Sequence, residues 1–149
     1  MKSLVAVDGS EESERALAYA TDVADAMDGS ITVVHAVDPS VYDLGGMEPI
    51  ASLADADERL VLENLEDAES RAMTVLEEAV DLAEELGSDV EADLLYGDPK
   101  REIPNYAAEE GFDAIYVGHR GRSERVEVLV GSVAKTLVER ADVPVTVVR

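Results

Sequence analysis

The chain has 149 residues, of which 34 are acidic and 12 are basic, so its formal net charge is −22. This length predicts one domain spanning residues 1–149, and the content of Val, Leu, Ile and Phe is high enough for a folded core rather than a disordered chain. The negative charge argues against nucleic acid and anionic membranes as partners, and the absence of cysteine excludes disulfides, thiolate catalysis and cysteine-based zinc sites.

The sequence has no run of about 18 apolar residues that would predict a membrane span. The apolar stretch near the start is too short for a signal peptide, so we expect a cytoplasmic protein. Only three of the twelve basic residues are lysines. An acidic, lysine-poor surface suits a protein that must stay hydrated in molar salt, which predicts a halophilic source; the alternative is an ordinary acidic protein.

The charge is unevenly distributed along the chain. Residues 1–100 contain 26 acidic and 5 basic residues, net −21, whereas residues 101–149 contain 8 and 7, net −1. Arg120, Arg122 and Arg125 lie close together in the nearly neutral part. An anionic ligand is therefore expected to bind there.

The first elements in chain order are a strand, a helix and a second strand. Ser3–Asp8 is mostly apolar and predicts a buried strand that ends in a turn. Ser10 is a suitable N-cap for a helix that stops near Gly29. Ile31–Val37 predicts the second strand, and the prolines and glycines of residues 38–55 predict a loop.

The most regular helical pattern follows the loop. Apolar residues recur at alternating steps of four and three between residues 61 and 86, and Gly87 is a natural stop. Val90–Tyr96 predicts a third strand. The pair Asp98-Pro99 predicts the start of a helix that runs to Glu110. Pro104 inside this segment lacks a backbone donor, so we expect it to kink the helix or shorten its start.

The last elements are a strand at Ala114–Val117 that Gly118 ends, a helix over Ser132–Arg140 and a strand at Val143–Val148. Strands that alternate with helices run parallel, with right-handed crossovers. The predicted fold class is therefore α/β: a three-layer fold with an open parallel five-stranded sheet and helices on both faces.

Two strand ends carry residues that suit an anionic ligand. Ligands of open parallel sheets bind beyond the carboxyl ends of the strands. Asp8-Gly9-Ser10 follows the first strand, and residues 118–123 follow the fourth and lead to Gly131-Ser132 at a helix start. Glycine amides, a helix start and arginines favour phosphate, while Asp8 suits ribose hydroxyls or a magnesium ion. The alternative is that these are only turn and capping residues.

Comparison with known nucleotide-binding motifs narrows the class of nucleotide-binding protein. The sequence contains neither GxxxxGK[ST] nor GxGxxG, which argues against a P-loop NTPase and a standard dehydrogenase. Gly118-x2-Gly121-x9-Gly131-Ser132 resembles the nucleotide motif of the universal stress protein family. The resemblance extends along the chain through Val5-Ala6-Val7-Asp8-Gly9-Ser10, Val34-His35-Ala36-Val37, Gly97-Asp98-Pro99 and the final Asp142-Val143-Pro144-Val145.

The resemblance implies a strand order of 3-2-1-4-5, a homodimer made through the last strand at residues 143–148, and binding of ATP with Mg²⁺. It places the nucleoside beside the first, second and fourth strands, with Asp8 at the ribose, and the phosphates at the glycine motif. The implied nucleotide-binding residues are Ala6, Asp8, Ala36, Val117, Gly118, Arg120, Gly121, Arg122, Gly131, Ser132 and Val133. No catalytic or metal-ligating residue is predicted.

The chain departs from the family pattern in two places. His119-Arg120 stands where the family has Ser or Thr followed by His, so Arg120 either strengthens phosphate binding or points to solvent. Ala36 replaces a larger aliphatic residue of the adenine pocket.

His35 is interpreted as a core or pocket-wall residue rather than a ligand. Tyr42, Gly45, Gly46 and Met47 belong either to a surface loop or to a cover over the nucleotide.

These features predict a cytoplasmic, dimeric, ATP-binding universal stress protein that acts as a nucleotide-responsive regulator in the stress response, with an unknown protein partner. The alternative is a slow ATP hydrolase or phosphoryl-transfer enzyme that uses the same site, since the arginines could stabilise a transferring phosphoryl group. A third possibility is a dimer whose nucleotide site is empty.

Overall fold

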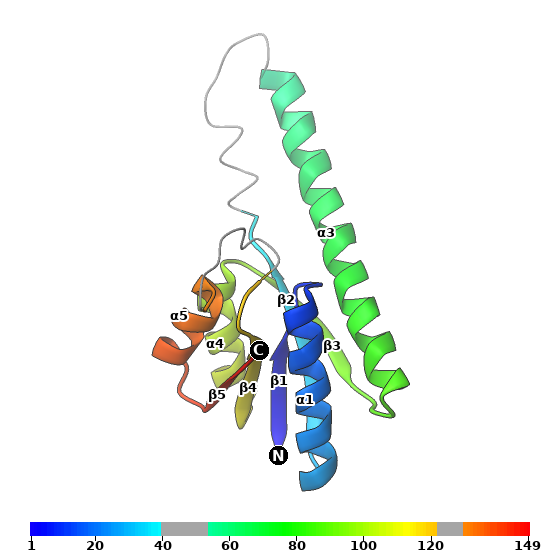
Figure 1. Cartoon of the computed structure of the whole chain (residues 1–149). Coiled ribbons are helices and arrows are strands. Elements are labelled where there is room, and N and C mark those ends of the chain that lie inside the picture. The colour runs from blue at the N-terminus through cyan, green and yellow to red at the C-terminus, as the bar shows by residue number, and fades with distance from the viewer. Residues whose placement is uncertain (40–53, 122–129) are drawn as a thin grey trace.

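The computed structural model describes residues 1–39, 54–121 and 130–149, with only the backbone for residues 54–64. In these residues strands and helices alternate along the chain (Figure 1). The strands are β1 Lys2–Ala6, β2 Ser30–Val37, β3 Glu91–Tyr96, β4 Ala114–Gly118 and β5 Val145–Val148. The helices are α1 Glu11–Met27, α3 Ala54–Glu85, α4 Pro99–Glu109 and α5 Ser132–Arg140.

The five strands form one parallel sheet in the order β3-β2-β1-β4-β5, which confirms the predicted fold. Ala6 of β1 lies between Val34 of β2 and Val117 of β4 in the register. The strand order reverses between β1 and β4, so the segments that follow these two strands diverge there. An open parallel sheet binds ligands at this kind of position.

Each face of the sheet is covered by a pair of helices (Figure 1). Side chains of a strand alternate between its faces. Val5 of β1 accordingly packs with α1 and α3, where Leu17 is fully buried. Its neighbour Leu4 packs with α4 and α5, where Leu137 is fully buried. The two cores hold β1 and β4 rigidly in the middle layer.

The predicted N-caps of α1 and α4 are confirmed. The Ser10 hydroxyl accepts a hydrogen bond from the Ser13 N–H, and the Asp98 carboxylate accepts one from the Lys100 N–H. Pro104 does not shorten α4, because the helix begins at Pro99 and contains Pro104. A proline at this point removes one donor but leaves the hydrogen bonds of the first turn in place.

Some element ends differ from the predicted ones. The helix α3 begins at Ala54, within the predicted loop and ahead of the periodic pattern. The strand β1 ends at Ala6 rather than Asp8, β4 includes Gly118, and β5 begins at Val145. Prolines lack the N–H that a strand uses in pairing, which accounts for the later start of β5 after Pro144.

The backbone conformation at the end of α1 shows why the helix stops there. Asp28, not Gly29, adopts the left-handed conformation that closes the helix, with φ 53°. A Cβ on Gly29 would lie 2.7 Å from the carbonyl oxygen of Met1. Glycine is therefore needed there for a close backbone approach and not for a positive φ.

Among the described residues, none of the helices is both long and apolar enough to cross a lipid bilayer.

Candidate functional site

A pocket lies at the carboxyl ends of β1 and β4, where the strand order reverses. It contains about 330 Å³ of empty space, part of which is open to solvent. Eight of the eleven residues predicted to bind a nucleotide line it: Ala6, Asp8, Val117, Gly118, Arg120, Gly121, Gly131 and Val133. The fold therefore brings together residues from three separate segments of the chain.

The turn after β1 fixes the Asp8 carboxylate. Its Oδ1 accepts hydrogen bonds from the Ser10 N–H at 3.0 Å and from the Ser10 hydroxyl at 2.5 Å. The Asp8 N–H donates to the Ser13 hydroxyl at 3.3 Å, and this hydroxyl donates to the Ser10 carbonyl at 3.0 Å. The N-cap of α1 thus also holds in a defined orientation the one carboxylate found in the lining among the residues that the structure describes.

Two glycines of the motif are required by close contacts. A Cβ on Gly121 would lie 2.8 Å from Asp8 Oδ2, so glycine allows the loop after β4 to approach this carboxylate. A Cβ on Gly118 would lie 2.8 Å from the backbone carbon of Glu12 and 3.0 Å from its oxygen. Glycine at 118 therefore lets β4 pass directly against the first turn of α1.

The starts of α1 and α5 offer different environments to an anion. The first turn of α1 carries Glu11, Glu12 and Glu14, and a side chain caps it. The helix α5 has no acidic residue in its first turn, and its N-cap, Gly131, has no side chain to cap the helix. Because the start of a helix carries partial positive charge, the α5 end of the pocket is the better position for a phosphate.

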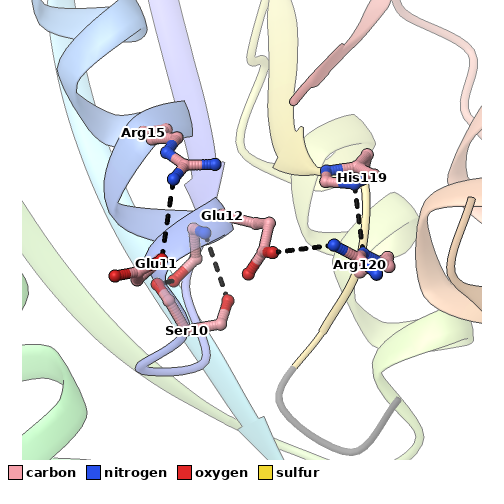
Figure 2. Close-up of polar contacts among 7 residues, drawn as sticks. Ser10, Glu11, Glu12, Arg15, His119 and Arg120 are labelled. Carbon is pink, nitrogen blue, oxygen red and sulfur yellow. Dashed lines mark hydrogen bonds and ion pairs between the residues drawn. The ribbon is translucent and has the colours of Figure 1, made fainter. Parts of the chain in front are cut away.

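Arg120 lies on the pocket wall and is turned toward α1 (Figure 2). Its Nε–H donates to His119 Nε2 at 3.1 Å, and its terminal nitrogen lies 3.5 Å from Glu12 Oε1. The other ring nitrogen of His119, Nδ1, is buried without a hydrogen-bond partner among the described residues. The Arg120 side chain is 37% exposed, with its guanidinium directed to Glu12.

The backbone of His119 connects the site to the rest of the fold. Its N–H donates to the Val148 carbonyl at 2.8 Å, and its carbonyl accepts from the Gly131 N–H at 2.5 Å. His119, directly after β4, is thereby hydrogen-bonded both to the end of β5 and to the residue before α5. These bonds set the position of Gly131 relative to the pocket.

Two predicted residues that the structure describes are not in the pocket lining. Ala36 lies further along β2, paired in register with Leu95. Ser132 is the first residue of α5 and is exposed, directly after Gly131. Arg122 lies outside the described residues, as do Tyr42, Gly45, Gly46 and Met47.

Two residues of the lining were not predicted. Ser13 and Ala134 both contribute to the pocket. Each lies three residues after a predicted helix start, Ser10 and Gly131, so the period of a helix brings it back to the same side. This spacing is the signal that could have identified them.

His35 is not in the pocket lining, but its ring contacts the backbone of the segment that precedes Asp8. Its ring Nδ1 is 2.6 Å from the Val7 carbonyl oxygen, so the Nδ1–H donates to this carbonyl. The side chain is half-buried. This arrangement agrees with a wall residue that supports the backbone before Asp8.

The pKa values that shift clearly belong to tyrosines outside the pocket lining. Burial, followed by a hydrogen bond to Asp93, raises the pKa of Tyr106 far above its ordinary value. Burial also raises the pKa of Tyr116. Both phenols therefore stay neutral near pH 7. Among the described residues, no three or more His, Asp or Glu side chains are grouped as a metal site.

Comparisons with known proteins agree with the sequence resemblance. The model of the universal stress protein family matches residues 1–149. The chain is 31% identical over 148 residues to universal stress protein YxiE of Bacillus subtilis, covering 99% of this chain and 98% of the relative. It is also similar to the universal stress protein of Archaeoglobus fulgidus in complex with dAMP, with a TM-score of 0.71, 26% identity and coverage of 100% and 98%.

A further similar structure is a universal stress protein in complex with cAMP, with a TM-score of 0.69 and 27% identity. The match covers 100% of this chain and 97% of that protein.

Proposed function

The chain belongs to the universal stress protein family, and on this premise we propose that it binds ATP with Mg²⁺ in the pocket between β1 and β4. The observation that carries the proposal is the convergence of the motif glycines, Asp8 and the uncapped start of α5 on one pocket. The complexes of two similar proteins with dAMP and cAMP support an adenine nucleotide as the ligand class.

The pocket residues fit the parts of this ligand. The apolar residues Ala6 and Val117 would face the nucleoside, and the fixed carboxylate of Asp8 would accept hydrogen bonds from the ribose hydroxyls. The backbone amides of Gly121 and Ser132 and the Ser132 hydroxyl would bind the phosphates at the α5 start, beside Gly131, whose own N–H donates to the His119 carbonyl. Mg²⁺ would neutralise part of the phosphate charge in the field of this acidic protein.

Asp8→Ala is expected to weaken ATP binding about tenfold. The substitution removes the ribose acceptor and the two Ser10 hydrogen bonds that shape the turn. Calorimetric titration with ATP and Mg²⁺ in molar KCl measures the change. Asp25→Ala, which removes one exposed carboxylate from α1 away from the pocket, is the matched control. Absence of ATP binding by the unmodified protein would refute the proposed function.

We propose further that the protein acts in the cytoplasm as a dimeric regulator whose nucleotide state a partner protein reads. β5 is an edge strand of the sheet, paired on one side with β4. Backbone groups alternate along a strand, and those of Pro144 and Val148 face β4. The N–H and C=O of Val145 and Val147 are therefore directed to the outer edge, where a second copy could pair.

Light scattering is expected to give twice the chain mass of 16.0 kDa. Val147→Pro should give the single-chain mass, because it removes an N–H from the outer edge while an edge strand otherwise tolerates proline. The circular dichroism spectrum tests that this variant remains folded. A single-chain mass for the unmodified protein would refute the dimer.

A second candidate function, slow hydrolysis of ATP, is favoured by Arg120 on the pocket wall. A guanidinium stabilises the charge of a transferring phosphoryl group. If the protein hydrolyses ATP, it should release phosphate. Arg120→Ala should abolish this release while the variant still binds ATP. Binding without release supports the regulator.

A further inference from the structure

Glu12 and Glu11 point in different directions from the first turn of α1 (Figure 2). Glu11 pairs with Arg15 on the same helix at 3.5 Å, and its side chain is 81% exposed. Glu12 pairs across the molecule with Arg120 at 3.5 Å, and its side chain is 18% exposed. The two neighbouring carboxylates thus have separate partners, only one of which belongs to the pocket.

The Glu12–Arg120 pair is set by the backbone. Gly118 brings β4 against the Glu12 backbone, so the residue two positions further along the chain reaches the same turn of α1. The Nε–H of Arg120 is bonded to His119 at the same time. Arg120 is therefore held from two sides before any ligand enters.

This contact changes the charge that the pocket offers to a ligand. Arg120 is the only cation among the described residues that line it. Glu12 forms an ion pair with this cation, and Asp8 adds a further negative charge. A phosphate must either compete with the Glu12 carboxylate for the guanidinium or bind beside it.

We propose that Glu12 is a specificity-determining residue: through Arg120 it lowers the affinity of the pocket for nucleotides with more negative charge. This inference rests on the proposed nucleotide binding. The penalty is expected to grow with the number of phosphates, because the attraction of Arg120 to the ligand, which the Glu12 carboxylate competes with, scales with ligand charge. A nucleoside, which carries no phosphate, is unaffected.

Glu12→Gln tests the inference with little change in shape. The amide fills the same space and can still accept a hydrogen bond from Arg120, while the negative charge is lost. Glu11→Gln removes the same charge one residue earlier and leaves the Arg120 contact intact, so it is the matched control. The ligands are adenosine, AMP and ATP, titrated by calorimetry with EDTA at the lowest KCl concentration at which circular dichroism shows the unmodified protein to be folded, so that salt and metal screen the phosphates least.

We expect Glu12→Gln to bind ATP about three to ten times more tightly than the unmodified protein, AMP less than this, and adenosine within about twofold. Glu11→Gln should stay within about twofold for all three ligands. In an Arg120→Gln background, the gain from Glu12→Gln should disappear, because the residue through which it acts has been removed.

Each other outcome contradicts the inference. Weaker ATP binding by Glu12→Gln would mean that Glu12 positions Arg120 for the phosphates. An equal gain for adenosine and ATP would indicate a general change of the pocket. A gain that persists with Arg120→Gln would exclude Arg120 as the link. Adenosine and ATP binding that no substitution alters would refute this inference alone, whereas no binding by any variant would refute the proposed function as well.

Discussion

Gly121→Val is expected to reduce the affinity for ATP at least about 100-fold, equal to roughly 2.7 kcal/mol at 25 °C. Even a single added carbon at this position would lie 2.8 Å from Asp8 Oδ2. The two further methyl groups of valine would displace the carboxylate and occupy space in the pocket. The measurement is calorimetric titration with ATP and Mg²⁺ in molar KCl.

The melting temperature separates this effect from misfolding. Gly121 lies beyond the end of β4, outside both hydrophobic cores, so the variant should melt close to the unmodified protein. Gly118→Val is the informative comparison, because its side chain would meet the backbone of α1 and should lower the melting temperature as well. A folded Gly121→Val variant with full ATP affinity would place the ligand elsewhere.

Leu137→Ala is expected to lower the free energy of unfolding by about 2–5 kcal/mol. Leu137 is fully buried in the core between α5, α4 and the sheet, so its truncation leaves a cavity. Urea-induced unfolding in molar KCl measures the loss. The salt condition follows from the acidic surface, whose charges repel one another in dilute buffer.

Val138→Ala is the matched control for this substitution. Val138 follows Leu137 on the same helix but is 57% exposed, so its truncation should change the free energy of unfolding by less than about 0.5 kcal/mol. Similar losses for the two variants would contradict the position of α5 on the sheet. That position matters for function, since the first residues of α5 form one end of the pocket.

Local sequence patterns were sufficient to predict the strands and helices that form the site. Alternating apolar strands and helices predicted the parallel sheet, and Ser10 and Asp98 marked two helix starts correctly. The glycine motif and its family resemblance predicted that Gly118, Gly121 and Gly131 lie in one site with Asp8. The order of the strands came from the family resemblance, because the alternation of elements alone does not say which strand lies beside which.

Long-range contacts could not be predicted in the same way. The pairing of Glu12 with Arg120 depends on how closely α1 and β4 approach, which no local pattern encodes. The role of Gly29 is similar, because its contact with Met1 exists only once β1 and β2 are paired. Helix periodicity marked the part of α3 that packs on the sheet but not its start at Ala54.

The net charge of −22 describes the whole chain and not the charge of the pocket. Many acidic residues are exposed on α1 and α3, whereas the pocket lining contains Asp8 and Arg120 as its charged side chains among the described residues. A polyanion as large as DNA would meet the whole surface. The proposed ligand, a single nucleotide with its magnesium ion, would meet only the few charges at this small site.

Binding of an adenine nucleotide where the strand order reverses can be followed residue by residue by NMR of the ¹⁵N-labelled protein during titration with ATP and Mg²⁺. The largest changes in amide chemical shift are expected at Gly118, Gly121 and Gly131, whose backbone lines the pocket. The absence of changes, or the largest changes along α3 and β3 on the far side of the sheet, would contradict it.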